Sequence, residues 1–172
     1  MLKGKKVILK SMERKEVSNI YNILCDKEVR EFDGAYIMLP GKEYIVEKFD
    51  KIMAGNTKYL TIVNEKGLTI GYITYKECKD SVNVYSLGIT IGKNFWGKGY
   101  GQDSINTLLS FLFLDRGAAR VELEVVDLNL KAINCYKKCG FKEEGQKRNR
   151  YFVKGKYTNV VIMGILKEEF IV

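Results

Sequence analysis

The 172-residue chain contains no histidine, and its four cysteines, Cys25, Cys78, Cys135 and Cys139, form no C-x-x-C pair. Zinc sites are built mainly from these two residue types at short spacings, so we expect no metal ion. We expect the cysteines to be buried small apolar residues, although Cys135 and Cys139 lie one helical turn apart and a thiol pair stays open. Without histidine, an acid or base near neutral pH must be a carboxylate, tyrosine, lysine, cysteine or positioned water.

Long apolar runs are missing too. No stretch approaches the roughly 20 apolar residues that a membrane span requires, and the basic start MLKGKKVILKS is followed by no apolar segment like that of a signal peptide. The chain has one proline, Pro40, and no repeat, low-complexity tract or Pro/Gly/Ser-rich linker. We therefore expect a cytoplasmic protein with a single domain over residues 1–172.

Positive charge is what the chain has in excess. Lys and Arg number 29 against 21 Asp and Glu, a net charge of +8. This excess predicts an anionic partner, and it does not choose among a nucleic acid, an acidic protein and a phosphorylated small molecule. The stretch KRNRYFVKGKY interleaves basic and aromatic residues, which makes a nucleic-acid-binding module the main alternative from another functional class. Since a two-sided hairpin shows the same alternation, a nucleic-acid partner is the less favoured interpretation.

Hydrophobic periodicity predicts an α+β fold. The order β-α-α-β-β-β-α-β-α-β-β indicates a mixed, mostly antiparallel sheet flanked by helices. The predicted elements are a strand at 6–11, helices at 17–24 and 45–53, strands at 58–64, 68–77 and 81–91, a helix at 102–117, a strand at 120–127, a helix at 129–140, and strands at 145–153 and 156–166.

The stretch FWGKGYG, residues 95–101, places three glycines at alternate positions just before the helix predicted from Gln102. Backbone N–H groups that carry no side chains between them converge readily on an anion, and the positive end of the helix dipole adds to the attraction. Phosphate is the usual ligand of such a loop.

Three alternatives compete for this loop. The stretch GKNFWGK at 92–98 matches the P-loop pattern, but Gly99 follows it where Ser or Thr should hold magnesium. A dinucleotide fingerprint would need glycine at Gln102 and a parallel strand before the loop, whereas the preceding strands are antiparallel in pattern. A glycine-rich turn that binds nothing is the third alternative.

The segments around the loop carry a resemblance to a known family. FWGKGYG followed by a helix, then VELEVVD, then NLKAINCYKKCGF at 129–141 resembles the GNAT family of N-acetyltransferases, whose patterns are Q/R-x-x-G-x-G/A and N-x-x-A-x-x-x-Y-x-x-x-GF. The closing stretch EEGQKRNRYFVKGKYTNVVIMGIL is similar to the last hairpin of the bacterial branch that acetylates ribosomal-protein amino termini, polyamines and amino sugars. The resemblance is detailed over residues 84–166, and Trp96 stands where the family has Gln or Arg.

The resemblance implies a GNAT-like fold and an acetyl-coenzyme A-dependent N-acetyltransferase, in which a primary amine attacks the acetyl group directly in a ternary complex. It also implies that Ile89 and Ile91 hold the pantetheine arm through backbone groups, with plain core strand residues as the alternative. Asn129 would both cap the helix and bind this arm, with capping alone as the alternative. Asp103 is expected to face away from the phosphates. The implied pyrophosphate-binding residues are Gly97, Lys98, Gly99, Tyr100, Gly101 and Gln102, with Lys98 adding charge.

Two proton-transfer residues follow from the same resemblance. Tyr136 matches the family's general acid, which protonates the departing thiolate, and its alternative role is aromatic packing. Glu124 resembles the carboxylate that serves as general base in some members; Glu122 lies on the same strand face, so Glu122, a water chain or a merely solvated face are alternatives. Many members of this branch carry glutamate at the position of Ser86, which favours Glu124 or water here.

The acceptor is the least determined feature. Phe32 and Tyr36 are candidate pocket walls, with plugging of the sheet edge as the alternative. The candidate acidic cluster, which Lys27 and Arg30 offset, consists of Glu28, Glu31 and Asp33. Because a protein of net charge +8 repels free polycations, we rank a peptide amino terminus or an amino sugar above spermidine. We expect a monomer or a homodimer.

Overall fold

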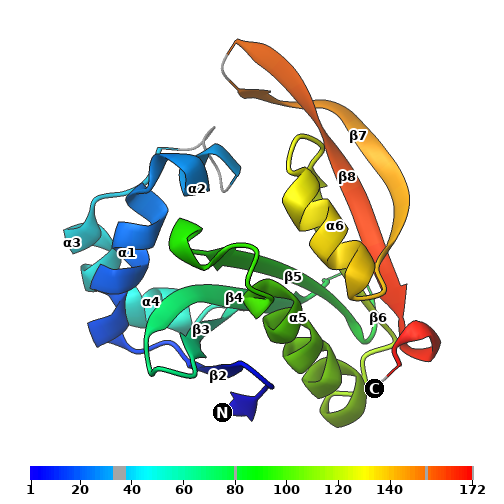
Figure 1. The fold of residues 1–172 in the computed structure, drawn as a ribbon, viewed down its shortest axis with the longest axis horizontal. Coiled ribbons are helices and arrows are strands. Elements are labelled where there is room, and N and C mark those ends of the chain that lie inside the picture. Colours follow the sequence, from blue (N-terminus) through cyan, green and yellow to red (C-terminus); the bar gives the residue numbers. More distant parts are fainter. Residues whose placement is uncertain (33–37, 80, 154, 172) are drawn as a thin grey trace.

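The computed structural model describes residues 1–32, 38–79, 81–153 and 155–171. Its centre is an eight-stranded sheet in the order β1-β2-β3-β4-β5-β6-β8-β7 (Figure 1). Neighbouring strands are antiparallel except β5 and β6, which are parallel. The strands are β1 (Leu2–Lys3), β2 (Val7–Ser11), β3 (Lys58–Asn64), β4 (Thr69–Glu77), β5 (Val84–Ile91), β6 (Arg120–Val126), β7 (Lys142–Val153) and β8 (Lys156–Leu166).

Helices cover both faces of this sheet (Figure 1). The first four lie together on one face, where α1, α3 and α4 enclose an apolar pocket against Tyr59 and Tyr72. The last two lie on the other face. The helices are α1 (Val17–Cys25), α2 (Lys27–Phe32), α3 (Lys42–Glu47), α4 (Phe49–Met53), α5 (Tyr100–Ser110) and α6 (Leu130–Lys138). Among the described residues, no helix is both long and apolar enough to cross a membrane.

The predicted fold class is confirmed, with differences in detail. The two-residue strand β1 was not predicted, since it is too short to show a period. Helix α2 was also missed, and the helix predicted at 45–53 is two short helices that meet at Lys48. Helix α5 begins at Tyr100 rather than Gln102, because Gly99 has φ +84° and forms its N-cap. Beyond Ser110 it continues as a π-helical turn over Phe111–Asp115.

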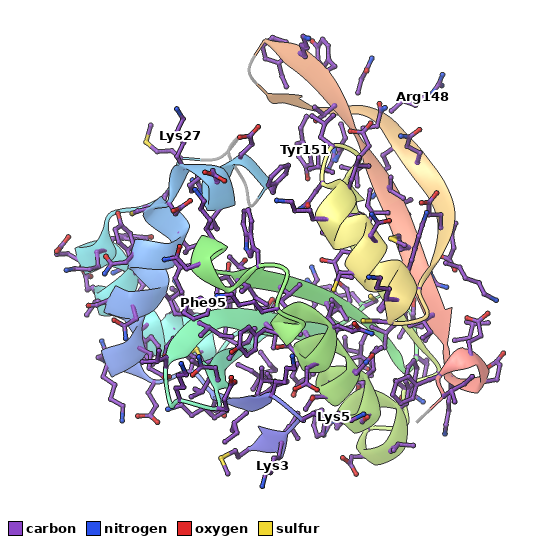
Figure 2. The ribbon with its side chains drawn as sticks, in the orientation of Figure 1. Lys3, Lys5, Lys27, Phe95, Arg148 and Tyr151 are labelled. Atoms are coloured by element: carbon purple, nitrogen blue, oxygen red, sulfur yellow. The ribbon has the colours of Figure 1, made fainter. Side chains whose placement is uncertain are left out.

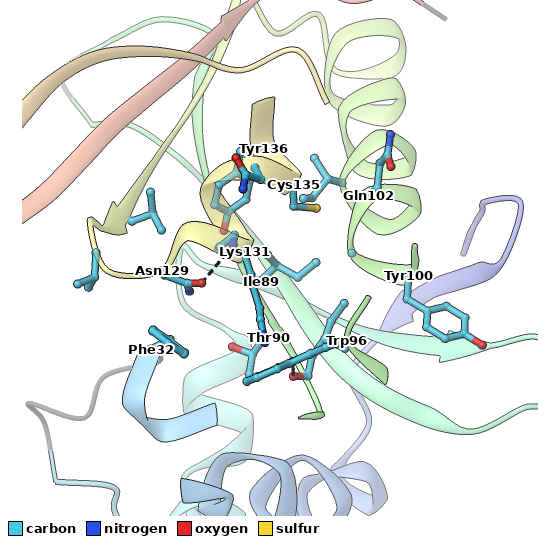
Figure 3. A pocket seen from close by; sticks show the side chains of 18 of the residues that line it. Phe32, Ile89, Thr90, Trp96, Tyr100, Gln102, Asn129, Lys131, Cys135 and Tyr136 are labelled. Atoms are coloured by element: carbon cyan, nitrogen blue, oxygen red, sulfur yellow. Dashed lines mark hydrogen bonds between the residues drawn. The ribbon is translucent and has the colours of Figure 1, made fainter. Parts of the chain in front are cut away.

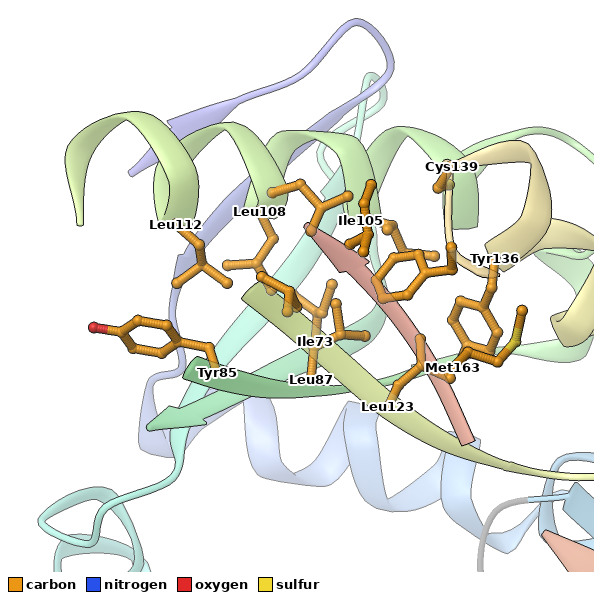
Figure 4. Close-up of a cluster of buried hydrophobic side chains, with 14 of the residues drawn as sticks. Ile73, Tyr85, Leu87, Ile105, Leu108, Leu112, Leu123, Tyr136, Cys139 and Met163 are labelled. Carbon is orange, nitrogen blue, oxygen red and sulfur yellow. The ribbon is translucent and has the colours of Figure 1, made fainter. Parts of the chain in front are cut away.

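The predicted apolar stripe of α5 forms the centre of the core. Ile105, Leu108, Leu109 and Leu112 are each at most 1% exposed, as their helical spacing predicts. They meet strand side chains such as Ile73, Leu87 and Leu123, and α6 adds Tyr136 and Cys139 to the same cluster (Figure 4). Burial of this stripe fixes α5, and with it the glycine loop just before the helix.

The amino-terminal turn holds α5 from its outer side. The backbone N–H groups of Lys5, Lys6 and Val7 donate to the Asp103 carboxylate at 3.1, 2.7 and 3.0 Å. The Lys6 ammonium also donates to the Lys98 carbonyl at 2.9 Å. Gly4 allows this close approach, because a Cβ there would lie 2.5 Å from the Asp103 carboxylate. The negative charge of Asp103 in the first turn additionally complements the helix dipole.

Removal of this carboxylate should destabilise the fold. We expect Asp103→Ala to lower the free energy of unfolding by about 2 kcal/mol, since hydrogen bonds to a charged group are lost and backbone donors lose their partner. Urea denaturation measures the difference. Asp115→Ala is the control, because Asp115 is exposed near the end of the same helical segment, and it should change the value by less than about 0.5 kcal/mol. Equal effects of the two substitutions would contradict this account.

Candidate active site

The sheet opens between its two parallel strands. In the described chain, the register of β5 with β6 runs from Val84–Arg120 to Ser86–Glu122 and then ends. Beyond that point a cavity of about 880 Å³ lies between β5, β6, α5, α6 and the end of α2 (Figure 3). The residues that the sequence analysis predicts to bind the cofactor and to transfer protons lie in this region.

The cavity passes through the sheet. It is lined on β5 by Ile89 to Ile91 and on β6 by Glu124 to Val126. Successive side chains of a strand point to opposite faces, so lining by consecutive residues means that the opening is reached from both sides. Glu124 lies on the face of α1 to α4, because its neighbours Leu123 and Val125 are buried in the core beneath α5 and α6. Tyr136 comes from α6, on the other face.

Backbone groups of β5 point into the opening. The Gly92 N–H donates to the Ile70 carbonyl at 2.9 Å, which places the even-numbered residues of β5 in the hydrogen-bonded pairs with β4. The main-chain groups of Ile89 and Ile91 therefore face β6. The Trp96 indole N–H donates to the Ile91 carbonyl at 2.6 Å, so one of these groups already has a partner in the loop.

The glycine loop forms one end of the cavity. Gly97 and Gly99 have φ values of +71° and +84°, which favour glycine. At Gly101 a Cβ would lie in ordinary van der Waals contact, 3.5 Å from the Cys135 sulfur and 3.6 Å from Ile91 Cδ1, so any larger side chain would have to extend beyond these two residues. The first N–H groups of α5 thus lie beside an open, side-chain-free wall, which suits a phosphate group.

Every predicted site residue lines this cavity except Lys98. The Lys98 ammonium donates to the Asn94 carbonyl at 2.8 Å and lies 5.9 Å from the Phe95 ring centroid. The side chain thus has contacts inside the loop, and the predicted role of Lys98 beside phosphate stays a prediction. Asp103 also lies outside the lining, and that it faces away from the phosphates stays a prediction.

Helix α6 supplies the opposite wall. The Asn129 side chain accepts the Ala132 N–H at 3.1 Å, which confirms its predicted capping role. Tyr136, 6% exposed, lies with its ring centroid 5.9 Å from that of Phe141, and it lines the cavity as well. The Lys131 ammonium lies 5.2 Å from the Trp96 ring centroid, a contact between the helix and the loop that the sequence did not predict (Figure 3).

The structure separates the two candidate glutamates. Glu124 lines the cavity and forms an ion pair with Lys147 of β7. Glu122 lies outside the lining and accepts from the Arg120 guanidinium at 3.3 Å and from the Cys78 thiol at 3.6 Å. Lys147 lies outside the lining, and its pairing with Glu124 was not predicted. Its only sequence signal is the basic stretch that was weighed as a nucleic-acid surface.

The expectation for the cysteines is partly wrong. Cys139 is buried, but Cys25 is exposed, and the half-buried Cys135 lines the cavity. A hydrogen bond with the Cys139 thiol lowers the pKa of Cys135, and the same contact raises the pKa of Cys139. Cys135 is buried less than expected because the glycine loop beside it leaves the cavity open.

The acceptor candidates are only partly described. Phe32 lines the cavity on the side away from Gln102, together with Val29 (Figure 3). Tyr36 and Asp33 lie outside the described residues. Glu28 is bonded to the Lys93 ammonium, and neither Glu28 nor Glu31 lines the cavity, so the described part of the predicted acidic cluster does not form its wall.

Comparison with known proteins identifies the family. The family model described as an acetyltransferase (GNAT) domain matches residues 6–142, most of the chain and all of the cofactor loop. The chain belongs to the GNAT family. It is therefore an acetyltransferase with acetyl-coenzyme A as its acetyl donor, and the P-loop and dinucleotide interpretations of the glycine loop do not apply.

Individual relatives are similar over nearly the whole chain. The uncharacterised prophage-derived N-acetyltransferase YokL of Bacillus subtilis is 24% identical over 97% of this chain and 93% of its own. The spermidine N(1)-acetyltransferase of Vibrio cholerae is 27% identical over 95% and 94%. A crystal structure of the Vibrio cholerae spermidine N-acetyltransferase with CoA and spermine has a TM-score of 0.85 at 24% identity, covering 95% of this chain and 96% of that one, which shows the shared fold.

A side chain at Gly101 should block the cofactor site without straining the backbone. We expect Gly101→Val to weaken coenzyme A binding by at least about tenfold, because its methyl groups would occupy the space between Cys135 and Ile91. Gly99 is less suitable, since its φ of +84° would add strain. Isothermal titration calorimetry measures the affinity. Gly145→Ala, where a Cβ meets open space, is the control; wild-type affinity in the Gly101→Val protein would exclude this wall as the cofactor site.

Proposed function

We propose that this N-acetyltransferase moves an acetyl group to a primary amine by direct attack, with donor and acceptor meeting in the opening between β5 and β6. The observation that carries the proposal is the passage of the cavity through the sheet. Tyr136 stands on the α5 and α6 side, and Glu124 stands on the side of α1 to α4. An acid on the donor side and a base on the acceptor side are what the transfer requires.

On the donor side, the residues fit a molecule with an anionic end and a long narrow arm. Acetyl-coenzyme A supplies the thioester from which the acetyl group is taken. The main-chain N–H groups of residues 97–102 and the amino-terminal end of α5 would hold its pyrophosphate. Ile89, Ile91 and Asn129 would hold the pantetheine arm, through backbone groups on β5 and the side-chain amide on α6.

Tyr136 is the proposed general acid. A tyrosine hydroxyl is protonated at neutral pH, since the usual tyrosine pKa is about 10 against about 8.5 for a thiol. It therefore has a proton to give to a departing thiolate, and α6 fixes the ring in the cavity wall. Packing against Phe141 holds the ring in one orientation.

Glu124 is the proposed general base. An amine with a pKa near 10 is about one part in a thousand free base at pH 7, a cost of about 4 kcal/mol that a nearby carboxylate offsets. Glu124 is the glutamate of the pair that reaches the cavity, whereas Glu122 is engaged with Arg120 and Cys78. Lys147 has to share or release this carboxylate when the amine arrives.

Two broader points belong to the proposal. The spermidine N(1)-acetyltransferase relative supports an amine as acceptor, and we propose the same chemical group here. All four cysteines are free thiols, a state typical of the cytoplasm. We propose that the protein works there and that residues 1–172 form a single catalytic domain.

A thiol-release assay with acetyl-coenzyme A and a panel of amines tests the activity itself. Wild-type protein that binds coenzyme A but releases no thiol with any amine would contradict the proposed activity.

Loss of the Tyr136 hydroxyl should slow turnover without weakening cofactor binding. We expect Tyr136→Phe to lower kcat by about 10²-fold, since the proton is needed only as the thiolate departs. Coenzyme A affinity should stay within about twofold, because the ring is retained. Tyr157→Phe, an exposed tyrosine outside the cavity lining, is the control. Unchanged turnover would leave Tyr136 as a packing residue.

The two glutamates should differ in their effect on the pH profile. We expect Glu124→Gln to move the rise of kcat/KM to higher pH, because the amine must then lose its proton to solvent before it binds productively. Glu122→Gln keeps the cavity carboxylate and should leave the profile close to that of the wild type. Rates across a pH series with one amine give the comparison. Identical profiles for both variants would show that the proton leaves through water.

A further inference from the structure

The ion pair of Glu124 and Lys147 spans three strands on the face of the sheet that α1 to α4 cover, which is called the acceptor face below. Glu124 on β6 lies opposite Ile162 of β8, and Lys147 on β7 lies opposite Val160, so the two side chains meet across β8. They are 46% and 43% exposed, which leaves both accessible to a ligand. The residue proposed as base is thus bonded to an ammonium group before any acceptor is present.

The cavity offers little else to a polycation. Among the described residues that line it, Glu124 is the single carboxylate, whereas Lys131 and Lys138 add positive charge. A polyamine carries several ammonium groups, and once one of them is paired with Glu124, the others lose solvation without gaining an anionic partner from the described lining. The described wall therefore disfavours acceptors whose only charges are positive.

The hairpin that borders the acceptor face is basic. Residues 145–160 of the sequence contain no Asp or Glu, and their basic residues are Lys147, Arg148, Arg150, Lys154 and Lys156. Figure 2 shows the end of β7 and β8 nearest their connecting turn projecting beyond the other strands of the sheet. Tyr151 is directed toward α2, and Arg148 lies on the outer side. The positive charge of this hairpin attracts an anionic group that approaches the cavity past β7 and β8, and it repels a cation.

An acceptor with two charged groups can pair with both Glu124 and Lys147 if it replaces each of them as the other's partner. An ammonium group that approaches Glu124 takes the place of Lys147 and leaves a second positive charge without a partner a few ångströms away. If the acceptor carries its own anionic group, Lys147 bonds to that group instead, and every charge is again paired. Because Glu124 and Lys147 are in direct contact, the two groups of the acceptor must be only a few bonds apart.

We propose that the acceptor is a small amine with an anionic group, a carboxylate or a phosphate, close to its nitrogen: the amine faces Glu124 and the anion binds Lys147. This inference rests on the proposed function and narrows its acceptor class. The apolar side chains of Val29, Phe32 and Val160 line the same cavity and would contact the carbon skeleton. Tyr151 lines it from the hairpin.

Matched amines that differ only in the anion test the substrate class. The wild-type protein is assayed by thiol release at fixed ionic strength with leucine against leucinamide, with phosphoethanolamine against ethanolamine, and with spermidine. We expect kcat/KM for the anionic member of at least one pair to exceed that of its neutral partner by about tenfold or more, the effect of one charge-assisted contact. The amino group of leucinamide is less basic than that of leucine, so a larger fraction of it is free base at neutral pH. This difference favours leucinamide, which makes a preference for leucine the stricter test. The carboxylate and phosphate arms show which anion is preferred.

Variants of Lys147 test the assigned residue. Lys147→Met should reduce the preference for the anionic member by about tenfold, whereas Lys147→Arg should retain it, because the charge is kept. Lys156→Met is the matched control: Lys156 is exposed on the same hairpin, but Lys147, not Lys156, forms the ion pair with Glu124, so the preference should not change. Thermal unfolding of each variant and its coenzyme A affinity confirm that fold and donor site are intact.

The outcomes separate the inference from the proposed function. Acetylation of spermidine or of the neutral amines in preference to the anionic ones overturns the inference and leaves the acetyltransfer activity standing. An anion preference that Lys147→Met and Lys156→Met change equally overturns the role of Lys147. Thiol release with none of the amines overturns the proposed function and the inference together.

Discussion

A sheet that opens between two neighbouring strands leaves main-chain N–H and C=O groups without their usual partners, and this constraint governs the site. After Ser86 and Glu122 the parallel strands part, and the backbone groups of Ile89 and Ile91 face the opening. The Trp96 indole bonds to one of these carbonyls. In the proposed binding mode, a ligand with amide groups along an extended arm would pair with the remaining backbone groups as a neighbouring strand would.

The rest of the molecule holds this opening in shape. Burial of the α5 stripe fixes the helix against the strands, and Asp103 fastens its first turn to the amino-terminal turn. Lys6 bonds to the Lys98 carbonyl behind the glycine loop. The loop can therefore present backbone N–H groups on its cavity side without folding inward, although it carries few side chains of its own. These hydrogen bonds support the loop from its outer side, while its inner side faces the cavity.

Much of the fold and of the donor site could be predicted from the sequence, because both depend on local patterns. Alternation located strands such as Lys58–Asn64, helical spacing located α5, and the two motifs placed the glycine loop and Tyr136 in one cavity. The failures involve features with no local signal. The two residues of β1 are too few for a period, and the Glu124–Lys147 pair depends on how β6, β8 and β7 are aligned. The bond from the Lys98 side chain back to the Asn94 carbonyl likewise has no signal in the sequence, and the role of Lys98 beside phosphate stays a prediction.

Trp96 has a consequence of another kind. It is the one tryptophan of the chain, it stands where the family pattern has Gln or Arg, and its ring lies in the cavity wall beneath the Lys131 ammonium. The indole N–H bond to Ile91 and the cation above the ring both affect how the indole absorbs and emits light. The single tryptophan thus lies in the wall of the proposed donor site, so tryptophan emission, excited selectively over that of the 11 tyrosines, is expected to respond to a ligand bound there.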